Sequence, residues 1–190
     1  MKNPVFLRFI REMPEEARVA AIVTLTKMST NEEDYTVRWS SANLVAVLTE
    51  LSKDKYWKVR SEVAENPATP AKILEQLSED EEEIVRWNVA KNQKTPAEVL
   101  TELSKDKDEE VRSAVAENPR TPPAVLTELS KDKYWKVRFE VAVNPATPAE
   151  VLTKLSKDKV EEVRRAVAVN SCYAKFKFSK RINNFWGEQY

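Results

Sequence analysis

The chain has 190 residues, with 31 basic and 31 acidic side chains, no histidine and one cysteine, Cys172. A single cysteine excludes an intrachain disulfide and a cysteine metal cluster. The lack of histidine removes the usual general base, the Ser-His and Cys-His nucleophile pairs and most zinc sites. Balanced charge predicts no global attraction to nucleic acid or to anionic membranes.

Residues 1–39 are expected to form an N-terminal helical cap with a partial repeat. The patterns FLxxI and RVAAIV place apolar residues at helical spacing. Charged residues such as Arg8, Glu12 and Arg18 interrupt this stretch, so it is no secretory signal, and no segment has the ~20 apolar residues of a membrane span. We therefore expect a cytoplasmic protein. The stretch MSTNEEDYTVRWSSAN, residues 28–43, looks like the second half of a repeat.

Residues 40–170 are predicted to be five tandem repeats. An asparagine recurs every 26 residues, at Asn66, Asn92, Asn118, Asn144 and Asn170. Four units align closely, for example NQKTPAEVLTELSKDKDEEVRSAVAE and NPATPAEVLTKLSKDKVEEVRRAVAV. The unit from Ser40 is degraded at its start. A period of this length is typical of an array in which each unit stacks on the next.

Each unit is predicted to contain two short helices. The first follows a Thr-Pro pair, with threonine expected as N-cap, proline at the first helical position, and Glu98 and Glu150 completing capping boxes. The threonines are Thr69, Thr95, Thr121 and Thr147. The second helix is expected to begin near a capping aspartate, at Asp80, Asp106, Asp132 or Asp158. Its buried face is expected to carry two valines four residues apart and then a small alanine.

The second helix is predicted to end at the asparagine. In most units a proline follows, which disfavours helical geometry in the residue before it. The chain has one glycine, Gly187, so glycine cannot end these helices. An asparagine side chain can bond the backbone groups that the turn leaves open. Stacked at one spacing, these side chains are expected to form a structural ladder.

The pattern NPxTPxxVLxxLxxDxxxxVRxxVA resembles the leucine-rich repeat variant family and is similar, more loosely, to HEAT-type helical repeats. The match covers about residues 40–170. The resemblance implies an all-α fold, a right-handed α-solenoid or superhelix of 26-residue two-helix repeats. Some members of that family carry an iron–sulfur cluster on a cysteine-rich segment. This chain lacks those cysteines, so we expect no cofactor.

Three columns on the second helix are candidates for a binding face. One arginine recurs in every unit, and the columns three residues before it and one residue after it vary between charged, small and aromatic residues. Arginine and aromatic residues are enriched at binding hot spots. The candidate face is Trp57, Arg60, Arg86, Trp87, Arg112, Trp135, Arg138, Phe139, Arg164 and Arg165.

The same columns also allow a purely structural interpretation. Each arginine could pair with the glutamate three residues earlier, with an acidic residue of the next unit, or with a tryptophan ring. The aromatic residues are better evidence of binding, because glutamate or serine fills their places in other copies. The acidic run at residues 78–83 indicates a solvated helix start. No phosphate-binding loop, nucleophile motif or acid–base pair is present, so we expect no enzyme.

The C-terminal segment, residues 171–190, breaks the repeat and carries four basic residues against one acidic residue. Residues 175–178 alternate lysine and phenylalanine, which is typical of an extended segment. We expect a basic-aromatic cap over Leu155, Val163 and Val167. The alternatives are a contact to nucleic acid through Lys175, Lys177, Lys180 and Arg181, or self-association on the acidic body of another copy.

The sequence therefore predicts a non-enzymatic repeat scaffold that binds an unknown protein or peptide through the second-helix face. The alternative is a HEAT-like protein that binds nucleic acid through the arginine column and the basic tail. A base-excising enzyme is a more distant third interpretation. Residues 31–170 carry 22 basic and 27 acidic residues, which weakens both nucleic-acid hypotheses.

Overall fold

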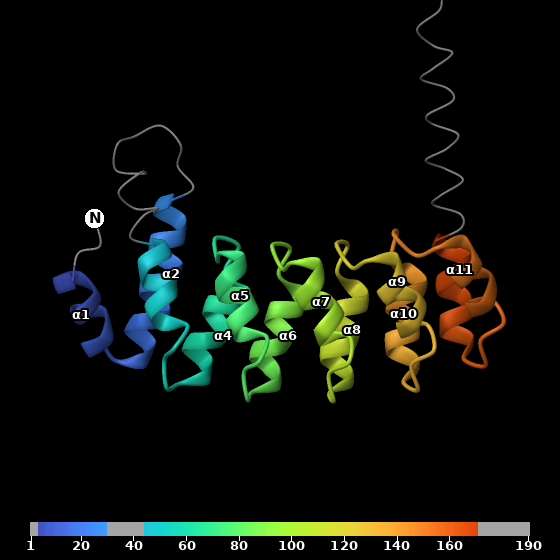
Figure 1. The fold of residues 1–190 in the computed structure, drawn as a ribbon, viewed down its shortest axis with the longest axis horizontal. Helices are drawn as coiled ribbons and strands as arrows, with labels where there is room; N and C mark the ends of the chain where they lie inside the picture. Colours follow the sequence, from blue (N-terminus) through green and yellow to red (C-terminus); the bar gives the residue numbers. More distant parts are fainter. Residues whose placement is uncertain (1–3, 30–43, 171–190) are drawn as a thin grey trace, which may run out of the picture. The chain divides into compact units, whose positions relative to one another are not determined.

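A computed structural model describes residues 4–29 and 44–170, and within these ranges every regular element is a helix. The described residues fall in two compact units, one ending at Leu103 and the other beginning at Ser104. Figure 1 shows the helices of each unit. Within this part of the chain, no helix is long and apolar enough to cross a membrane.

The first unit contains α1 (Pro4–Glu12), α2 (Glu15–Ser29), a helix over residues 44–51, α4 (Trp57–Glu65), α5 (Ala71–Leu77), α6 (Glu83–Lys91) and α7 (Ala97–Leu103). The second contains α8 (Glu109–Glu117), α9 (Pro123–Leu129), α10 (Trp135–Val143), α11 (Ala149–Leu155) and a helix over residues 161–170. The repeat is therefore a seven-residue helix followed by a nine-residue helix, both α-helical. Helices this short depend on packing against their neighbours for stability.

Second helices of successive repeats pack side by side, α2 on α4 and α4 on α6 in the first unit and α8 on α10 in the second. The paired valines of α4, α6, α8 and α10 are fully buried, as predicted; Val137 and Val141 on α10 are both 0% exposed. The alanine after them is buried at Ala116 and Ala142 but exposed at Ala168. The leucines and valines of the first helices complete each core.

The asparagine ladder is present in both units. Asn144 ends α10, its Oδ1 accepts from the backbone N–H of Ala146, and its Nδ2 donates to the backbone oxygens of Ala116 and Asn118, one repeat earlier. Asn92 and Asn170 make the corresponding bonds to the preceding repeat. Asn92 and Asn144 thus each order their own turn and bond to the turn of the preceding repeat.

The threonines do not cap the helices that follow them, so that prediction is wrong. Thr147 precedes the N-cap residue Pro148, and its Oγ1 donates to the backbone oxygen of Val141, 2.6 Å away at the end of α10. Thr69, Thr95 and Thr121 do the same six residues back. The Thr147 N–H is bonded to the Asn144 oxygen, so it does not join a capping box with Glu150. The threonine hydroxyl therefore bonds a backbone oxygen at the C-terminal end of one helix and does not cap the N-terminus of the next.

A helix of the N-terminal part of the chain packs on α4 as a preceding second helix would. The second helix that packs on α4 is α2, and its Arg18 pairs with Asp54 at 2.9 Å. Arg18 lies 42 residues before Arg60, whereas the repeat period is 26, so periodicity alone did not find it. Most of the stretch predicted to supply that helix, residues 28–43, lies outside the described residues, as does the C-terminal segment 171–190.

Candidate binding surface

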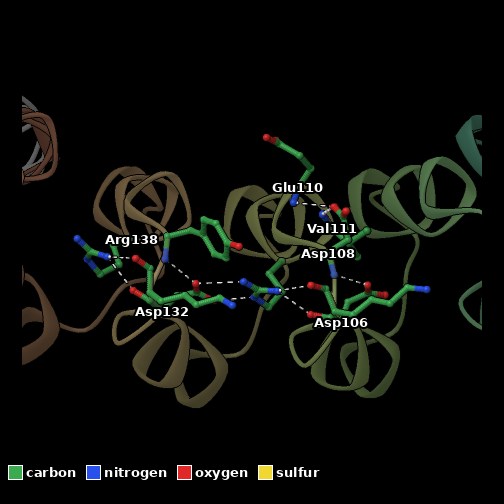
Figure 2. Close-up of polar contacts among 10 residues, drawn as sticks. Asp106, Asp108, Glu110, Val111, Asp132 and Arg138 are labelled. Carbon is green, nitrogen blue, oxygen red and sulfur yellow. Dashed lines mark hydrogen bonds and ion pairs between the residues drawn. The ribbon is translucent and has the colours of Figure 1, made fainter.

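The recurrent arginines are structural. Arg138 on α10 is 6% exposed, and its Nε donates to Asp158 of the next repeat at 2.7 Å. Its Nη1 donates to the backbone oxygen of Asp132 at 2.7 Å, a contact shown in Figure 2. The hydrogen bond from Arg138 lowers the pKa of Asp158, as does a bond from the Val160 backbone N–H. The guanidinium therefore joins consecutive loops through both a carboxylate and a carbonyl.

The other members of the column follow the same plan. Arg60 pairs with Asp80 and Arg112 with Asp132, in both cases 20 residues ahead. Arg86, 7% exposed, donates to the backbone oxygens of Asp80 and Glu81. The sequence allowed several partners for these arginines. Arg60, Arg112 and Arg138 pair with an acidic residue of the next repeat. Arg60, Arg86, Arg112 and Arg138 are consequently too buried to offer a row of guanidinium groups to phosphates.

The aspartates are not helix N-caps, which corrects a second prediction. Asp132 accepts from the Tyr134 backbone N–H at 2.9 Å, two residues on, and α10 then begins after Tyr134. Asp80 and Asp158 make the same turn. A side chain that does cap a second helix is that of Asp108 on α8. It accepts from the backbone N–H groups of Glu110 and Val111 (Figure 2). The carboxylate of the recurrent aspartate accepts a hydrogen bond within its loop and pairs with the arginine of the preceding repeat.

Two copies share an identical fifteen-residue stretch, AVLTELSKDKYWKVR, at residues 46–60 and 124–138. In both, the tyrosine ring lies between a loop lysine and the arginine of the preceding repeat. Arg112 lies 5.5 Å and Lys133 4.9 Å from the Tyr134 ring centroid, and Arg18 and Lys55 surround Tyr56 similarly. The tryptophans that follow, Trp57 and Trp135, are 39% and 42% exposed.

The surroundings of these two tryptophans differ. On α10, positions four and eight residues after Trp135 are Phe139, half-buried, and Val143, 38% exposed. Trp135 and Phe139 meet edge to face with ring centroids 6.3 Å apart. Residues at this spacing share one face of a helix. We call Trp135, Phe139 and Val143 the apolar stripe.

No such stripe exists on α4 or α6. The positions after Trp57 hold the buried Ser61 and the charged Glu65. Trp87 on α6 is half-buried, with the Lys91 ammonium 4.7 Å from its ring. On α4 and α6 the tryptophan side chains therefore stand singly, whereas α10 presents a continuous row.

The surface beside the apolar stripe has an acidic surplus. On α8, α10 and residues 161–170, the exposed charged side chains are four glutamates and two cations. They are Glu110, Glu117, Glu161, Glu162, Lys136 and Arg165. Lys136 is bonded to Glu110 at 3.0 Å, and Arg165 pairs with Glu161. Arg164 is half-buried and donates to the Asp158 backbone oxygen.

The sequence columns missed Val143 and its counterpart Val169, which is 66% exposed. The signal was available, since other copies place Glu65, Lys91 and Glu117 in that column. The predicted contacts of Lys175, Lys177, Lys180 and Arg181 lie outside the described residues. Among those described, no group of three or more acidic or cysteine side chains is placed to hold a metal ion.

The repeat contacts agree with comparisons to known proteins. Residues 57–82 and 109–133 match the family model described as leucine rich repeat variant. These two segments are similar to leucine rich repeat variant repeats. Each matched segment runs from a second helix through the Asn-Pro turn and the next first helix, so it includes one asparagine and one threonine of the type described above. No curated protein matches the chain in a sequence search.

Solved structures show the same fold. A leucine-rich repeat variant protein with a novel repetitive structural motif is 27% identical, with a TM-score of 0.56 over 90% of this chain and 67% of that one. An engineered protein is 18% identical, with a TM-score of 0.53 over 85% and 92% of the two chains. A computationally designed armadillo repeat protein is 17% identical, with a TM-score of 0.50 over 88% and 97%. The fold is that of helical repeat scaffolds.

Proposed function

We propose that this chain is a non-enzymatic scaffold whose second-helix face binds a peptide segment with aromatic and basic side chains. The observation that carries the proposal is the apolar stripe. Most other copies hold a charged residue or serine at these positions, so folding of the repeat does not require aromatic residues there. Exposed rows of apolar residues rimmed by polar ones are typical of interaction sites.

The chemistry of the partner follows from the surroundings. Trp135 and Phe139 provide flat apolar surface, which suits aromatic side chains. The acidic surplus of the neighbouring helices attracts basic residues and repels acidic ones. The similar designed armadillo repeat protein was made for modular peptide recognition. That likeness supports only the suitability of the fold; the proposed specificity depends on the stripe and its charges.

The repeat itself supplies the variants for a test. Trp135→Glu and Phe139→Ser introduce the residues that stand in the same columns at Glu109 and Ser113, so the fold is expected to tolerate them. The probe is a fluorescein-labelled peptide of alternating lysine and phenylalanine, with binding measured by fluorescence anisotropy. We expect the W135E/F139S variant to bind it at least about tenfold more weakly than the wild type.

Trp57→Glu is the matched control, because it makes the same change in the identical stretch without an apolar stripe. It should leave the dissociation constant within about twofold, and circular dichroism should show unchanged helix content in each variant. Equal losses for W57E and W135E/F139S would overturn the proposal. So would equal affinity for a peptide of alternating glutamate and phenylalanine.

A further inference from the structure

The three residues that the C-terminal segment is expected to cover are buried. Leu155, Val163 and Val167 are 3%, 0% and 6% exposed. The apolar side chains that remain exposed in this unit include Trp135, Val143 and Val169, at 42%, 38% and 66%. Exposed apolar surface in this unit therefore lies on α10 and on the helix over residues 161–170.

The chemistry of residues 171–190 matches this face. The segment holds six of the chain's sixteen aromatic residues, together with four basic residues and one acidic residue. Phe176 and Phe178 are two residues apart, so in an extended backbone they project from one side while Lys175 and Lys177 project from the other. Such a segment could place phenylalanines on the apolar stripe and lysines toward the surrounding glutamates.

The attachment point favours the segment of the same chain. Asn170 Nδ2 donates to the backbone oxygens of Ala142 and Asn144, so the described chain ends beside the C-terminal end of α10. From Val143 to Trp135 the helix rises about 12 Å, at roughly 1.5 Å per residue. About four extended residues cover that distance. A short tether also gives its attached ligand an effective concentration on the order of 1 mM.

We propose that residues 171–190 fold back along α10 and occupy the apolar stripe of their own chain, with Phe176 and Phe178 as the anchoring side chains. This inference rests on the proposed function and adds to it. It identifies the C-terminal segment as the ligand that occupies the apolar stripe when no external partner is bound. An external peptide with similar aromatic and basic residues would then bind by displacing the tail.

Paramagnetic relaxation in the full-length chain tests this contact. A nitroxide is attached at position 179 in a Cys172→Ser, Ser179→Cys variant, and the indole N–H signals are observed by NMR. The Trp135 signal should be broadened, and the Trp57 signal, from the identical stretch in the other unit, should stay sharp. Adding Phe176→Ser and Phe178→Ser should restore the Trp135 signal.

Mixing distinguishes one chain from two. An equimolar mixture of spin-labelled chain without nitrogen-15 and nitrogen-15-labelled chain without nitroxide should leave Trp135 sharp. Broadening in that mixture would show docking on a second copy and overturn the intramolecular contact. No broadening of Trp135 in the labelled chain, or equal broadening of Trp57 and Trp135, would also overturn it.

Peptide affinity separates this inference from the proposed function. If the tail occupies the stripe, F176S/F178S should bind the lysine–phenylalanine peptide about tenfold more tightly than the wild type, as expected for loss of a tethered competitor. An unchanged affinity would reject the tail as occupant. If that peptide still bound the wild type and lost affinity with W135E/F139S, the binding surface itself would stand.

Discussion

Arg138 and Asp158 face each other across a repeat boundary, with Nε and Oδ2 2.7 Å apart and side chains only 7% and 9% exposed. Two hydrogen bonds join the pair, from Nε to Oδ2 and from Nη2 to Oδ1. A buried pair of this kind adds little net stability compared with apolar packing, but removing one partner leaves the other charge unpaired. The pair therefore makes each repeat sensitive to the presence of the next.

Replacing Arg138 with methionine should lower the free energy of unfolding by about 3 kcal/mol, because it leaves Asp158 buried without its partner. Arg165→Met is the control, since its pair with Glu161 is exposed and should contribute under about 1 kcal/mol. Urea denaturation followed by circular dichroism measures both. Similar losses for the two variants would contradict the structural role of the buried arginine.

Low pH should weaken the stabilisation from the Arg138–Asp158 pair. The hydrogen bond from Arg138 holds the pKa of Asp158 below its ordinary value of 3.8. An acid whose pKa is lower in the folded state contributes stability above its unfolded pKa and loses it as the pH falls through the folded one. The difference in urea midpoint between the wild type and Asp158→Asn should thus be largest near pH 6 and shrink below about pH 4. A difference that stayed constant with pH would contradict this.

Glu62 on α4 should behave in the opposite sense. Burial raises its pKa, and the charge of Glu65 raises it further. Because the folded pKa lies above the unfolded one, the ionised carboxylate destabilises the fold at neutral pH, and the penalty disappears as the pH falls below about 4.5. Glu62→Gln should gain about 0.5 kcal/mol at pH 7, a small effect because the group is partly screened. The exposed Glu75→Gln should show no gain in the same thermal and urea measurements.

Asn144→Ala should remove about 2 to 3 kcal/mol of unfolding free energy. The buried oxygens of Ala116 and Asn118 would lose a donor, and the Ala146 N–H would lose an acceptor. Asn170→Ala removes the same donor at the half-buried end of the array and should cost less, because water can replace it there. Hydrogen exchange at Ala146 provides a local readout. Fast exchange only in the Asn144 variant would match the ladder.

Local sequence patterns predicted the parts of the fold that depend on one repeat. The valine pairs, the two short helices and the asparagine turn all follow from spacing and proline chemistry. The roles of Thr147 and Arg138 did not, because a threonine before proline suits an N-cap as well as a bond to the preceding helix. The arginine's partner lies 20 residues away, at a distance that only packing determines.

The candidate surface was predicted only in part. The columns pointed to Trp135 and Phe139 because these residues depart from the other copies. They did not separate Trp135 from Trp57, since the fifteen residues 46–60 and 124–138 are identical. What differs is the position one turn later, Phe139 against Ser61, and the valine after it. The exposure of this row depends on α8 and residues 161–170, which lie a full repeat away in sequence.

The bonds from Asn92, Asn144 and Asn170 to the carbonyls 26 and 28 residues earlier have a consequence for how such a chain can change in length. All three use the same donor, acceptors and spacing, whereas Asn66 Nδ2 donates to the Thr26 hydroxyl. After duplication or deletion of one whole repeat, the next asparagine therefore finds equivalent backbone oxygens to bond. An insertion of any other length in a second helix would change the spacing between the asparagine and those oxygens. The number of copies can therefore change by whole repeats in evolution. An aromatic row on one copy distinguishes that repeat from the others and gives the array one specific binding position.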